Sequence, residues 1–370
     1  MTLGASHFIM HDLDIKGKAY SLIDVHLAAP MENLLHLTAF APISLNDRMN
    51  IAPERLKGFA ITDTKLRIPM IKSLKAADIE FVTQVHGTNI EVHDLLGGEG
   101  VRRGTVDLTV DKHGLQASGD ILFNGVAMQA KWDEDFVKSK IDGENTTTFS
   151  LTSYIDAGDL QAFNVDISNF LDGKMPVQAT FTGRNFNITQ AHFTADATPA
   201  IINVSQMAWQ KTADRPVRLS GDIKFAPQEV TISPLIAKGP NIDLSADLYW
   251  NTGKSDRFKA EFNVLQLDKN RFTASLERSG SEPYFANISA TEIDVSPFLD
   301  LDDPENKAIE TSRTASTTHI EIVAEKAHFL NGIEATNLTL QSIFTENGPQ
   351  QSKGKATFAS EKDVRLSIFI

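Results

Sequence analysis

The chain contains no cysteine among its 370 residues. Disulfide bonds, thiol nucleophiles and cysteine-ligated metal sites are therefore excluded in one step. The absence does not fix a cellular compartment, although a chain without thiols can cross an oxidising space without mispairing.

Long apolar runs and an excess of basic residues are also missing. No stretch reaches the roughly 18 apolar residues that a membrane-spanning helix needs. The opening residues, MTLGASHFIMHDLDIKG, do not contain a basic segment followed by an apolar segment, which is the order found in a signal peptide. With 35 Lys and Arg against 48 Asp and Glu, the net charge is −13. Nucleic acids and anionic membrane surfaces are bound through clustered Lys and Arg, so the sequence predicts no nucleic-acid partner and no broad basic membrane face.

What the sequence has is alternation of apolar and polar residues. The pattern runs through residues 106–111, 217–225, 242–250 and 363–370. Side chains alternate across a strand, so each segment predicts a strand with one dry face and one wet face. Turn sequences such as Asn124-Gly125 separate the strands at short intervals. The expected fold is mainly β, a long antiparallel series of hairpins.

Helical patterns are few. Residues 30–40 carry leucines at helical spacing, and residues 52–58 fit one further turn with Gly58 as its stop. Short helical turns are expected at 168–171 and 296–301. Residues 302–318 are polar without periodicity and predict a loop or linker.

Two groups of residues could carry chemistry. His7 and His11 have the spacing of a helical metal pair, but their surroundings alternate like a strand. Asp133, Glu134 and Asp135 could supply paired carboxylates for glycoside hydrolysis, although three adjacent acids in a turn rarely do so. Neither pattern is specific enough to predict an active site.

Two loops have residues that could bind an ion or a phosphate. Acidic residues that could hold calcium lack the glycine and closing glutamate of the helix-loop-helix motif; they are Asp300, Asp302, Asp303 and Glu305. Gly97, Gly98 and Gly100 precede two arginines but lead into a strand, not a helix. The sequence therefore predicts no metal, no cofactor and no enzymatic activity.

Several segments together resemble the AsmA-like superfamily, in particular its YhdP-type branch, which is related to TamB. The first is residues 77–136, where the match is carried by Gly104, Gly114, Leu115, Gly119, Gly125 and Trp132. The second is residues 192–211, with Asp196 and Trp209-Gln210-Lys211. The third is residues 286–300, with Asp294 and Leu299, and the opening helical stretch is the fourth.

The resemblance implies a bridge-like lipid-transfer protein. It implies a curved sheet that forms an open hydrophobic groove for phospholipid acyl chains. It also implies a Gram-negative periplasmic location, inner-membrane anchoring, and phospholipid transport that supports outer-membrane integrity. The membrane-contacting segments would lie outside this chain, which ends within the apolar strand VRLSIFI and is expected to be a piece of a longer protein. The oligomeric state is not indicated.

The resemblance also divides the chain. Residues 1–76 are expected to be an N-terminal β segment with short helices, 77–301 the groove region, 302–318 the linker and 319–370 further strands. The residues expected to line the groove are Leu108, Phe123, Met128, Leu219, Phe225, Leu244, Leu248 and Trp250. Two alternatives stay open: a structural or adhesin-like β-sandwich whose apolar faces pack on each other, and a component of a lipopolysaccharide bridge.

Overall fold

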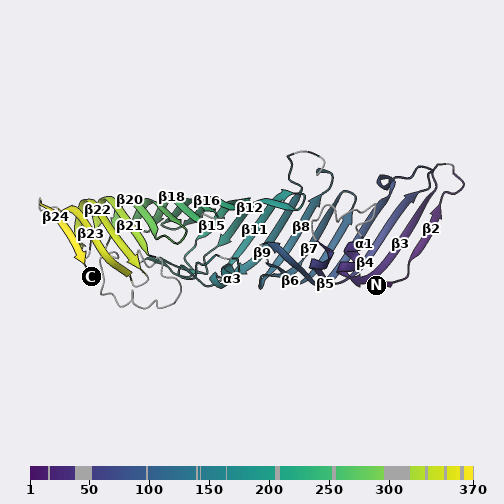
Figure 1. The fold of residues 1–370 in the computed structure, drawn as a ribbon, viewed down its shortest axis with the longest axis horizontal. Coiled ribbons are helices and arrows are strands. Elements are labelled where there is room, and N and C mark those ends of the chain that lie inside the picture. The colour runs from purple at the N-terminus through teal and green to yellow at the C-terminus, as the bar shows by residue number, and fades with distance from the viewer. Residues whose placement is uncertain are drawn as a thin grey trace. The chain divides into compact units, whose positions relative to one another are not determined.

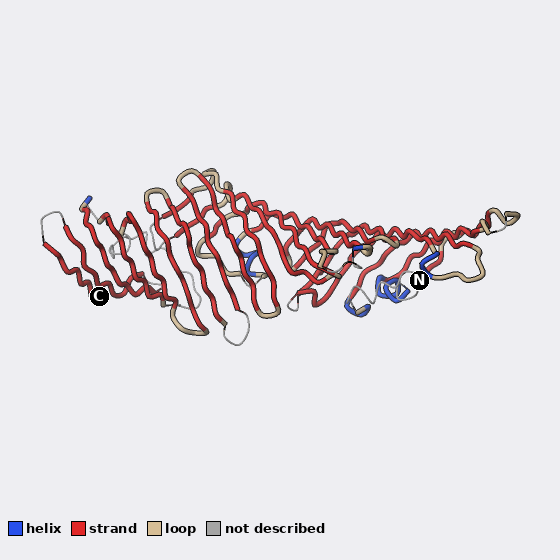
Figure 2. Tube along the Cα trace, turned by 90° about the horizontal axis from the view of Figure 1, so that it is seen from above, coloured by secondary structure: helices blue, strands red, loops and turns tan. Residues whose placement is uncertain are grey.

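The computed structural model describes most of the chain and is mainly β, with 70% strand and 7% helix (Figures 1 and 2). The described residues are 1–15, 17–37, 52–96, 99–138, 141, 143–163, 165–204, 209–251, 256–295, 317–329, 332–345, 348–358 and 362–369. The predicted fold class is confirmed at this level.

The chain divides into two compact units. Unit 1 contains Met1–Asp166 and Pro176–Ala191, and unit 2 contains Ile167–Met175 and His192–Ile370. These units differ from the sequence segments expected above, which rest on the family resemblance and on the polar stretch at 302–318.

Unit 1 is a meander of long strands. Each strand from β2 to β9 pairs antiparallel with the next in chain order, and β1 also pairs with β3. All its described strands belong to one sheet, so unit 1 is not a sandwich of two sheets. The strands are β1 (Thr2–Leu3), β2 (His7–His11), β3 (Tyr20–Pro30), β4 (Leu56–Pro69), β5 (Glu80–Leu96), β6 (Glu99–Asp111), β7 (Gly114–Phe123), β8 (Val126–Asp135), β9 (Thr147–Ile155) and β11 (Met175–Arg184), followed by β12 (Asn187–Asp196), which continues into unit 2.

The two faces of this sheet differ in chemistry because the side chains alternate. In β6, Val106, Leu108 and Val110 are buried or half-buried, whereas Asp107 and Thr109 are exposed. We call the face that carries Val106 and Leu108 the inner face and the opposite one the outer face. The predicted alternation of residues 106–111 is thus confirmed.

Helices in the described part of the chain are short (Figure 2). They are α1 (Met31–Leu37), α3 (Ala157–Gln161) and the 3₁₀ turns η1 (Pro53–Arg55) and η2 (Ala76–Asp78). Helix α1 fits the pattern predicted for residues 30–40, of which 38–40 lie outside the described residues. No described helix has the length and apolar character needed to cross a membrane.

One predicted helical turn needs correction. Residues 52–58 form only the 3₁₀ turn η1 before β4 begins at Leu56. Gly58 does not stop a helix: it lies inside β4 at φ +114°, and a Cβ there would meet the Asn89 carbonyl oxygen at 2.7 Å. The turn predicted at 168–171 is present at residues 168–170, where the N–H groups of Phe170 and Leu171 donate to the Ile167 carbonyl, and Leu171 then begins strand β10. The expected turn at 296–301 lies outside the described residues.

Unit 2 contains a second meander and a small separate sheet. The small sheet consists of β10 (Leu171–Asp172), β13 (Ile201–Val204) and β14 (Trp209–Lys211). The strands of the meander are β15 (Arg218–Ala226), β16 (Glu229–Gly239), β17 (Ile242–Asn251), β18 (Arg257–Leu267), β19 (Asn270–Ser279), β20 (Tyr284–Asp294), β21 (Thr318–His328), β22 (Glu334–Thr345), β23 (Gly348–Phe358) and β24 (Lys362–Phe369). Strands β15 and β17 cover residues 218–225 and 242–250 of the predicted alternation, and β24 covers residues 363–369, with residue 370 outside the described residues.

One pairing in unit 2 departs from the antiparallel prediction. Strands β20 and β21 are parallel, with Phe285 opposite His319. A parallel pair cannot be joined by a hairpin and needs a crossover of about a dozen residues or more. The polar stretch predicted as a linker falls in this connection, so the expected antiparallel sheet is instead a mixed one.

Candidate functional site

An apolar cavity of about 450 Å³ lies on the inner face of unit 1. Every residue that lines it belongs to unit 1, and most of them are aliphatic, aromatic or glycine. It is lined by Val25, Leu27, Met31, Leu34, Leu35, Leu37, Leu56, Thr62, Thr64, Leu66, Thr83, Val85, Gly87, Ile90, Val92, Val101, Val106, Leu108, Val110, Leu115, Ala117, Ser118, Gly119, Ile121, Ala130, Lys131, Trp132 and Phe149.

Helix α1 closes part of this face. Leu34 packs with Ala29 and Ala60, while Leu35 packs with Leu56 and Ile90. Leu37, at the end of the helix, is 42% exposed and also lines the cavity. The helix therefore covers one part of the apolar strands with one side and offers apolar surface to the cavity.

Farther along the strands, the inner face is only partly covered. Leu66, Val85, Val106 and Leu108 line the cavity and remain half-buried. Burying apolar surface contributes about 25 cal/mol per Å². An apolar face left half covered therefore has unused capacity to bind an apolar ligand.

Two of the polar side chains on this face hydrogen-bond to each other. Thr64 Oγ1 and Thr83 Oγ1 are 3.1 Å apart and form a hydrogen bond between β4 and β5. Thr62 is 4% exposed. On this face the buried Nε1 of Trp132 has no hydrogen-bond partner among the described residues, and its ring packs edge-on against Phe186 with centroids 5.2 Å apart.

The three acids after Trp132 do not form a catalytic pair. Glu134 is 3% exposed and accepts hydrogen bonds from Thr146 Oγ1 at 2.7 Å and Thr147 Oγ1 at 2.6 Å. Asp135 accepts from the backbone N–H groups of Lys138 and Val137, which hold the pKa of that carboxyl below its ordinary value. Asp133 is exposed on the outer face. These carboxylates stabilise the turn after β8.

The predicted groove residues of unit 1 have different positions. Leu108 lines the cavity. Met128 is 6% exposed in a core cluster with Val101 and Ile155. Phe123 packs against that cluster and stacks on Phe163 with centroids 5.8 Å apart. The structure thus places Leu108 at the cavity, and Phe123 and Met128 in the neighbouring core.

The predicted groove residues of unit 2 share one face of its meander. Leu219 and Leu244 both lie opposite Ala237, and Phe225 and Trp250 both lie opposite Val230. Leu248 follows Leu244 on the same side of β17, and all five side chains are half-buried. Their contact with lipid stays a prediction.

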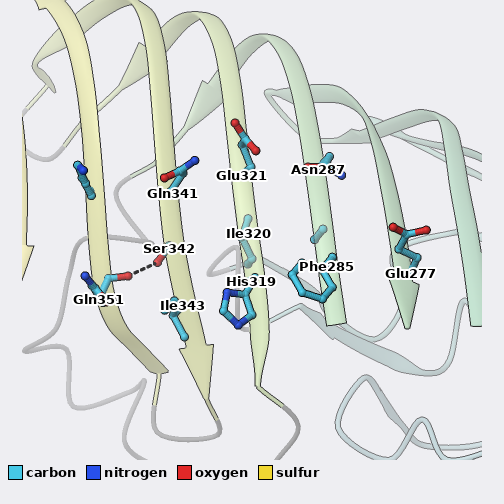
Figure 3. Close-up of a pocket in the computed structure, with 12 residues that line it drawn as sticks. Glu277, Phe285, Asn287, His319, Ile320, Glu321, Gln341, Ser342, Ile343 and Gln351 are labelled. Atoms are coloured by element: carbon cyan, nitrogen blue, oxygen red, sulfur yellow. Dashed lines mark hydrogen bonds between the residues drawn. The ribbon is translucent and has the colours of Figure 1, made fainter. Parts of the chain in front are cut away.

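Two further depressions lie on polar surfaces. One in unit 1, of about 610 Å³, is lined on the outer face by Asp63, His86 and Asp107 among others. The other, in unit 2, has about 450 Å³ and is bordered by two rows of side chains on β19–β23 (Figure 3). Phe285 stacks on His319 in one row, and Asn287, Glu321 and Gln341 form the other. These rows are cross-strand ladders that stabilise a solvated face.

Histidines of the outer face pair with carboxylates of the next strand. His86 Nδ1 lies 2.7 Å from Asp107 Oδ1, and His26 hydrogen-bonds Asp63. The described residues include no group of three His, Asp or Glu side chains placed to hold a metal ion. His7 and His11 lie on strand β2, where His11 stacks on Tyr20 at 5.0 Å.

Two charged groups anchor the small sheet of unit 2. Asp268 accepts from Trp209 Nε1 at 2.6 Å and pairs with both terminal nitrogens of Arg215, which lowers the pKa of Asp268. Lys211 is fully buried, and its Nζ donates to the carbonyls of Ala197, Thr198 and Ala200. Burial lowers the pKa of Lys211. Asp268 and Lys211 are both hydrogen-bonded to groups of the protein itself, so neither residue indicates a ligand site.

The remaining candidates from the sequence lie largely outside the described residues. Gly97, Gly98 and the acidic residues 300–305 are among them, so the structure does not place the proposed phosphate or calcium loops. Gly100 lies in β6, where a Cβ would meet the Val92 carbonyl oxygen at 1.9 Å. Close strand packing therefore accounts for this glycine.

Most of the cavity comes from segments that the sequence analysis did not name as lipid-facing. Strands β3, β4 and β5 contribute Val25, Leu66 and Val85, and α1 contributes its leucines. The alternation in β4 and β5 is hard to recognise in the sequence because threonines occupy inner-face positions. When residues are classified only as polar or apolar, these threonines are counted as polar. Reading Thr as compatible with a half-buried strand face would have found it.

Comparison with known proteins gives no match: no family model, no curated protein and no solved structure is similar to the chain.

Proposed function

We propose that the chain binds the acyl chains of lipids on the inner face of unit 1. The observation that carries this proposal is the apolar cavity, with its half-buried wall of Leu66, Val85, Val106 and Leu108. An elongated apolar ligand fits such a wall better than a polar metabolite, because the face offers almost no free hydrogen-bonding group.

An apolar binding face would lower the free-energy cost of moving a lipid through water. Each methylene removed from an apolar environment into water costs about 0.8 kcal/mol, so a phospholipid with roughly 30 methylenes faces a barrier on the order of 25 kcal/mol. A protein surface that keeps the chains dry removes most of that cost. The acidic, polar outer face keeps the protein itself in solution.

The wider proposal is a phospholipid conduit between the inner and outer membranes of a Gram-negative cell. Its support is the resemblance of residues 77–136, 192–211 and 286–300 to the AsmA-like superfamily, together with the sheet architecture. In this proposal the predicted residues of β15 and β17 form an apolar path within unit 2. No catalytic residue is required, because holding an acyl chain on an apolar surface neither forms nor breaks a covalent bond.

The proposal is tested by measuring lipid bound to the purified chain. Mass spectrometry of an organic extract should detect about one phospholipid or more per chain. Leu108→Asp places a charge in the cavity and should lower bound lipid several-fold. Thr109→Asp is the matched control: the neighbouring residue, on the outer face of the same strand, should leave bound lipid unchanged.

Circular dichroism of both variants establishes that they fold. Loss of lipid in folded Leu108→Asp and its retention in Thr109→Asp support the proposal. Equal lipid content in the wild type and both variants contradicts it. A wild-type chain that carries no lipid, and takes up none from phospholipid vesicles, instead favours a structural β module.

A further inference from the structure

Strand β2 is an edge strand of unit 1. It pairs with β3 from His7 opposite Asp24 to His11 opposite Tyr20. Among the described strands, no other is paired with β2, and Figure 1 shows it beside β3. The backbone N–H and C=O groups on its far side are therefore available to another strand.

This edge lacks the features that normally protect one. Natural edge strands carry Lys, Pro or inward-pointing charges that prevent pairing with other chains. The sequence of β2, HFIMH, has no proline, no lysine and no acid. The large apolar side chains of this edge and its flanking turns are 43–64% exposed; they are Leu3, Phe8, Ile9, Met10, Leu13 and Ile15.

We propose that a second copy of this chain pairs with this edge, β2 against β2 in antiparallel orientation, to form a twofold-symmetric dimer. The sequence of β2 is self-complementary in this arrangement. With the axis at Ile9, Ile9 lies opposite its own copy, Phe8 opposite Met10, and His7 opposite His11. Apolar residues thus meet apolar residues at the centre of the strand, and each contact occurs twice about the axis, as in any isologous interface.

The arrangement also preserves the two faces of the sheet. Phe8 lies opposite Ile23 on β3, and Ile23 is on the same side of β3 as Val25 and Leu27, which line the cavity. A twofold axis perpendicular to the sheet keeps each inner face on the same side. The inner apolar faces of the two copies therefore join across the axis without any change of register.

The flanking residues add to the contact. In an antiparallel pair, the end of β2 near Leu3 meets the partner's turn that carries Leu13 and Ile15. Six half-exposed apolar side chains from each copy and two strand backbones would bury on the order of 1,000 Å². This is near the lower limit for specific interfaces, so the dimer is expected to dissociate in the micromolar range.

The first test measures molar mass against concentration. Sedimentation velocity on the full chain should show a monomer that converts to a dimer as the concentration rises to about 200 µM. Ile9→Lys places two positive charges at the axis and should weaken dimerisation at least tenfold. Ile61→Lys is the matched control, because Ile61 is also an exposed outer-face isoleucine (54% against 50%) but lies on the interior strand β4.

The second test fixes the register. The chain has no cysteine, so Ile9→Cys introduces a single thiol. Directly opposed strand residues are within the Cα separation of about 4.4–6.8 Å that a disulfide needs. Under mild oxidation, Ile9→Cys should form covalent dimers, and Ile61→Cys should not. A mixture of Phe8→Cys and Met10→Cys should cross-link the two variants to each other.

The proposal is overturned if the chain stays monomeric up to that concentration and Ile9→Cys cross-links no faster than Ile61→Cys. It is equally overturned if a dimer forms but Ile9→Lys leaves its dissociation constant unchanged, because the contact would then lie elsewhere.

Discussion

Thr64 and Thr83 are cross-strand partners whose hydroxyl oxygens lie 3.1 Å apart on the inner face of unit 1. One hydroxyl donates to the other, so each of these two polar side chains has a hydrogen-bond partner within an apolar wall. Their methyl groups remain available to the cavity. This pair explains how a face with threonines in its sequence can still offer an apolar surface.

Replacing one member of the pair should cost more than replacing both. Thr64→Val leaves the Thr83 hydroxyl without its partner and should lower the free energy of unfolding of unit 1 by about 1 kcal/mol. The double variant, with Val at both positions, should be close to wild type. The free energy of unfolding of each variant is measured by urea titration, with hydrogen–deuterium exchange in β4 and β5 as the probe of unfolding. Equal and additive losses for the two single variants would show that the hydrogen bond contributes nothing.

Gly119 should be irreplaceable for a steric reason. A Cβ at this position would meet the Thr105 carbonyl oxygen at 2.0 Å and the Val106 Cα at 2.9 Å. Gly119→Ala must therefore push β7 away from β6 and should destabilise unit 1 by roughly 1–3 kcal/mol.

Gly104→Ala provides the control for that prediction. Its added Cβ would meet Ile121 Cγ2 at 3.2 Å, which is a side-chain atom that can shift. Thermal unfolding should show a markedly smaller loss for Gly104→Ala than for Gly119→Ala. A Gly119→Ala protein as stable as wild type would mean that the two strands are not as close as described.

The ion pair of Arg215 and Asp268 should make unit 2 sensitive to acid. Hydrogen bonds from Arg215, and then from Trp209, hold the pKa of Asp268 below its ordinary value of 3.8. The carboxylate therefore contributes stability above that value, and the contribution is lost as the pH falls through the lowered pKa. Because Asp268 is 41% exposed, the contribution is about 1 kcal/mol or less.

The variant Asp268→Asn isolates this contribution. It should be less stable than wild type at pH 7, and the two proteins should converge as the pH falls well below 3.8. Urea unfolding of unit 2 at several pH values measures the difference. A difference that stays constant from pH 7 downward would assign the loss to packing and not to charge.

The sequence predicted the type of fold better than it predicted the site. Alternation around Val106 and Leu244 placed strands correctly, because the period of two is a local property of the chain. The parallel pairing of β20 with β21 was missed, because it depends on a long crossover that carries no turn sequence. The turn predicted at 168–171 is present, but the start of β10 at Leu171 was missed, because it depends on long-range pairing with β13.

The cavity was anticipated at Leu108 but not at most of its other residues. Val25 and Val85 line the cavity because β3 and β5 both pair with β4, which places the two side chains on the inner face of the sheet. Strand pairing is a long-range property that local sequence patterns do not reveal. Met128 was expected to line the groove, yet it is 6% exposed among Val101, Ile121 and Val126. Alternation identifies the face on which a side chain lies but not which part of that face is covered by other segments, such as α3 and its neighbours.

Site-specific photo-cross-linking tests acyl-chain binding on the inner face most directly. A photoreactive amino acid at Val106 faces the cavity, and one at Thr105 lies on the opposite face of the same strand. After incubation with phospholipid vesicles and irradiation, intact-mass spectrometry should detect a phospholipid adduct at position 106 and none at position 105. Absence of an adduct at 106, or equal labelling at both positions, would contradict lipid binding by this face.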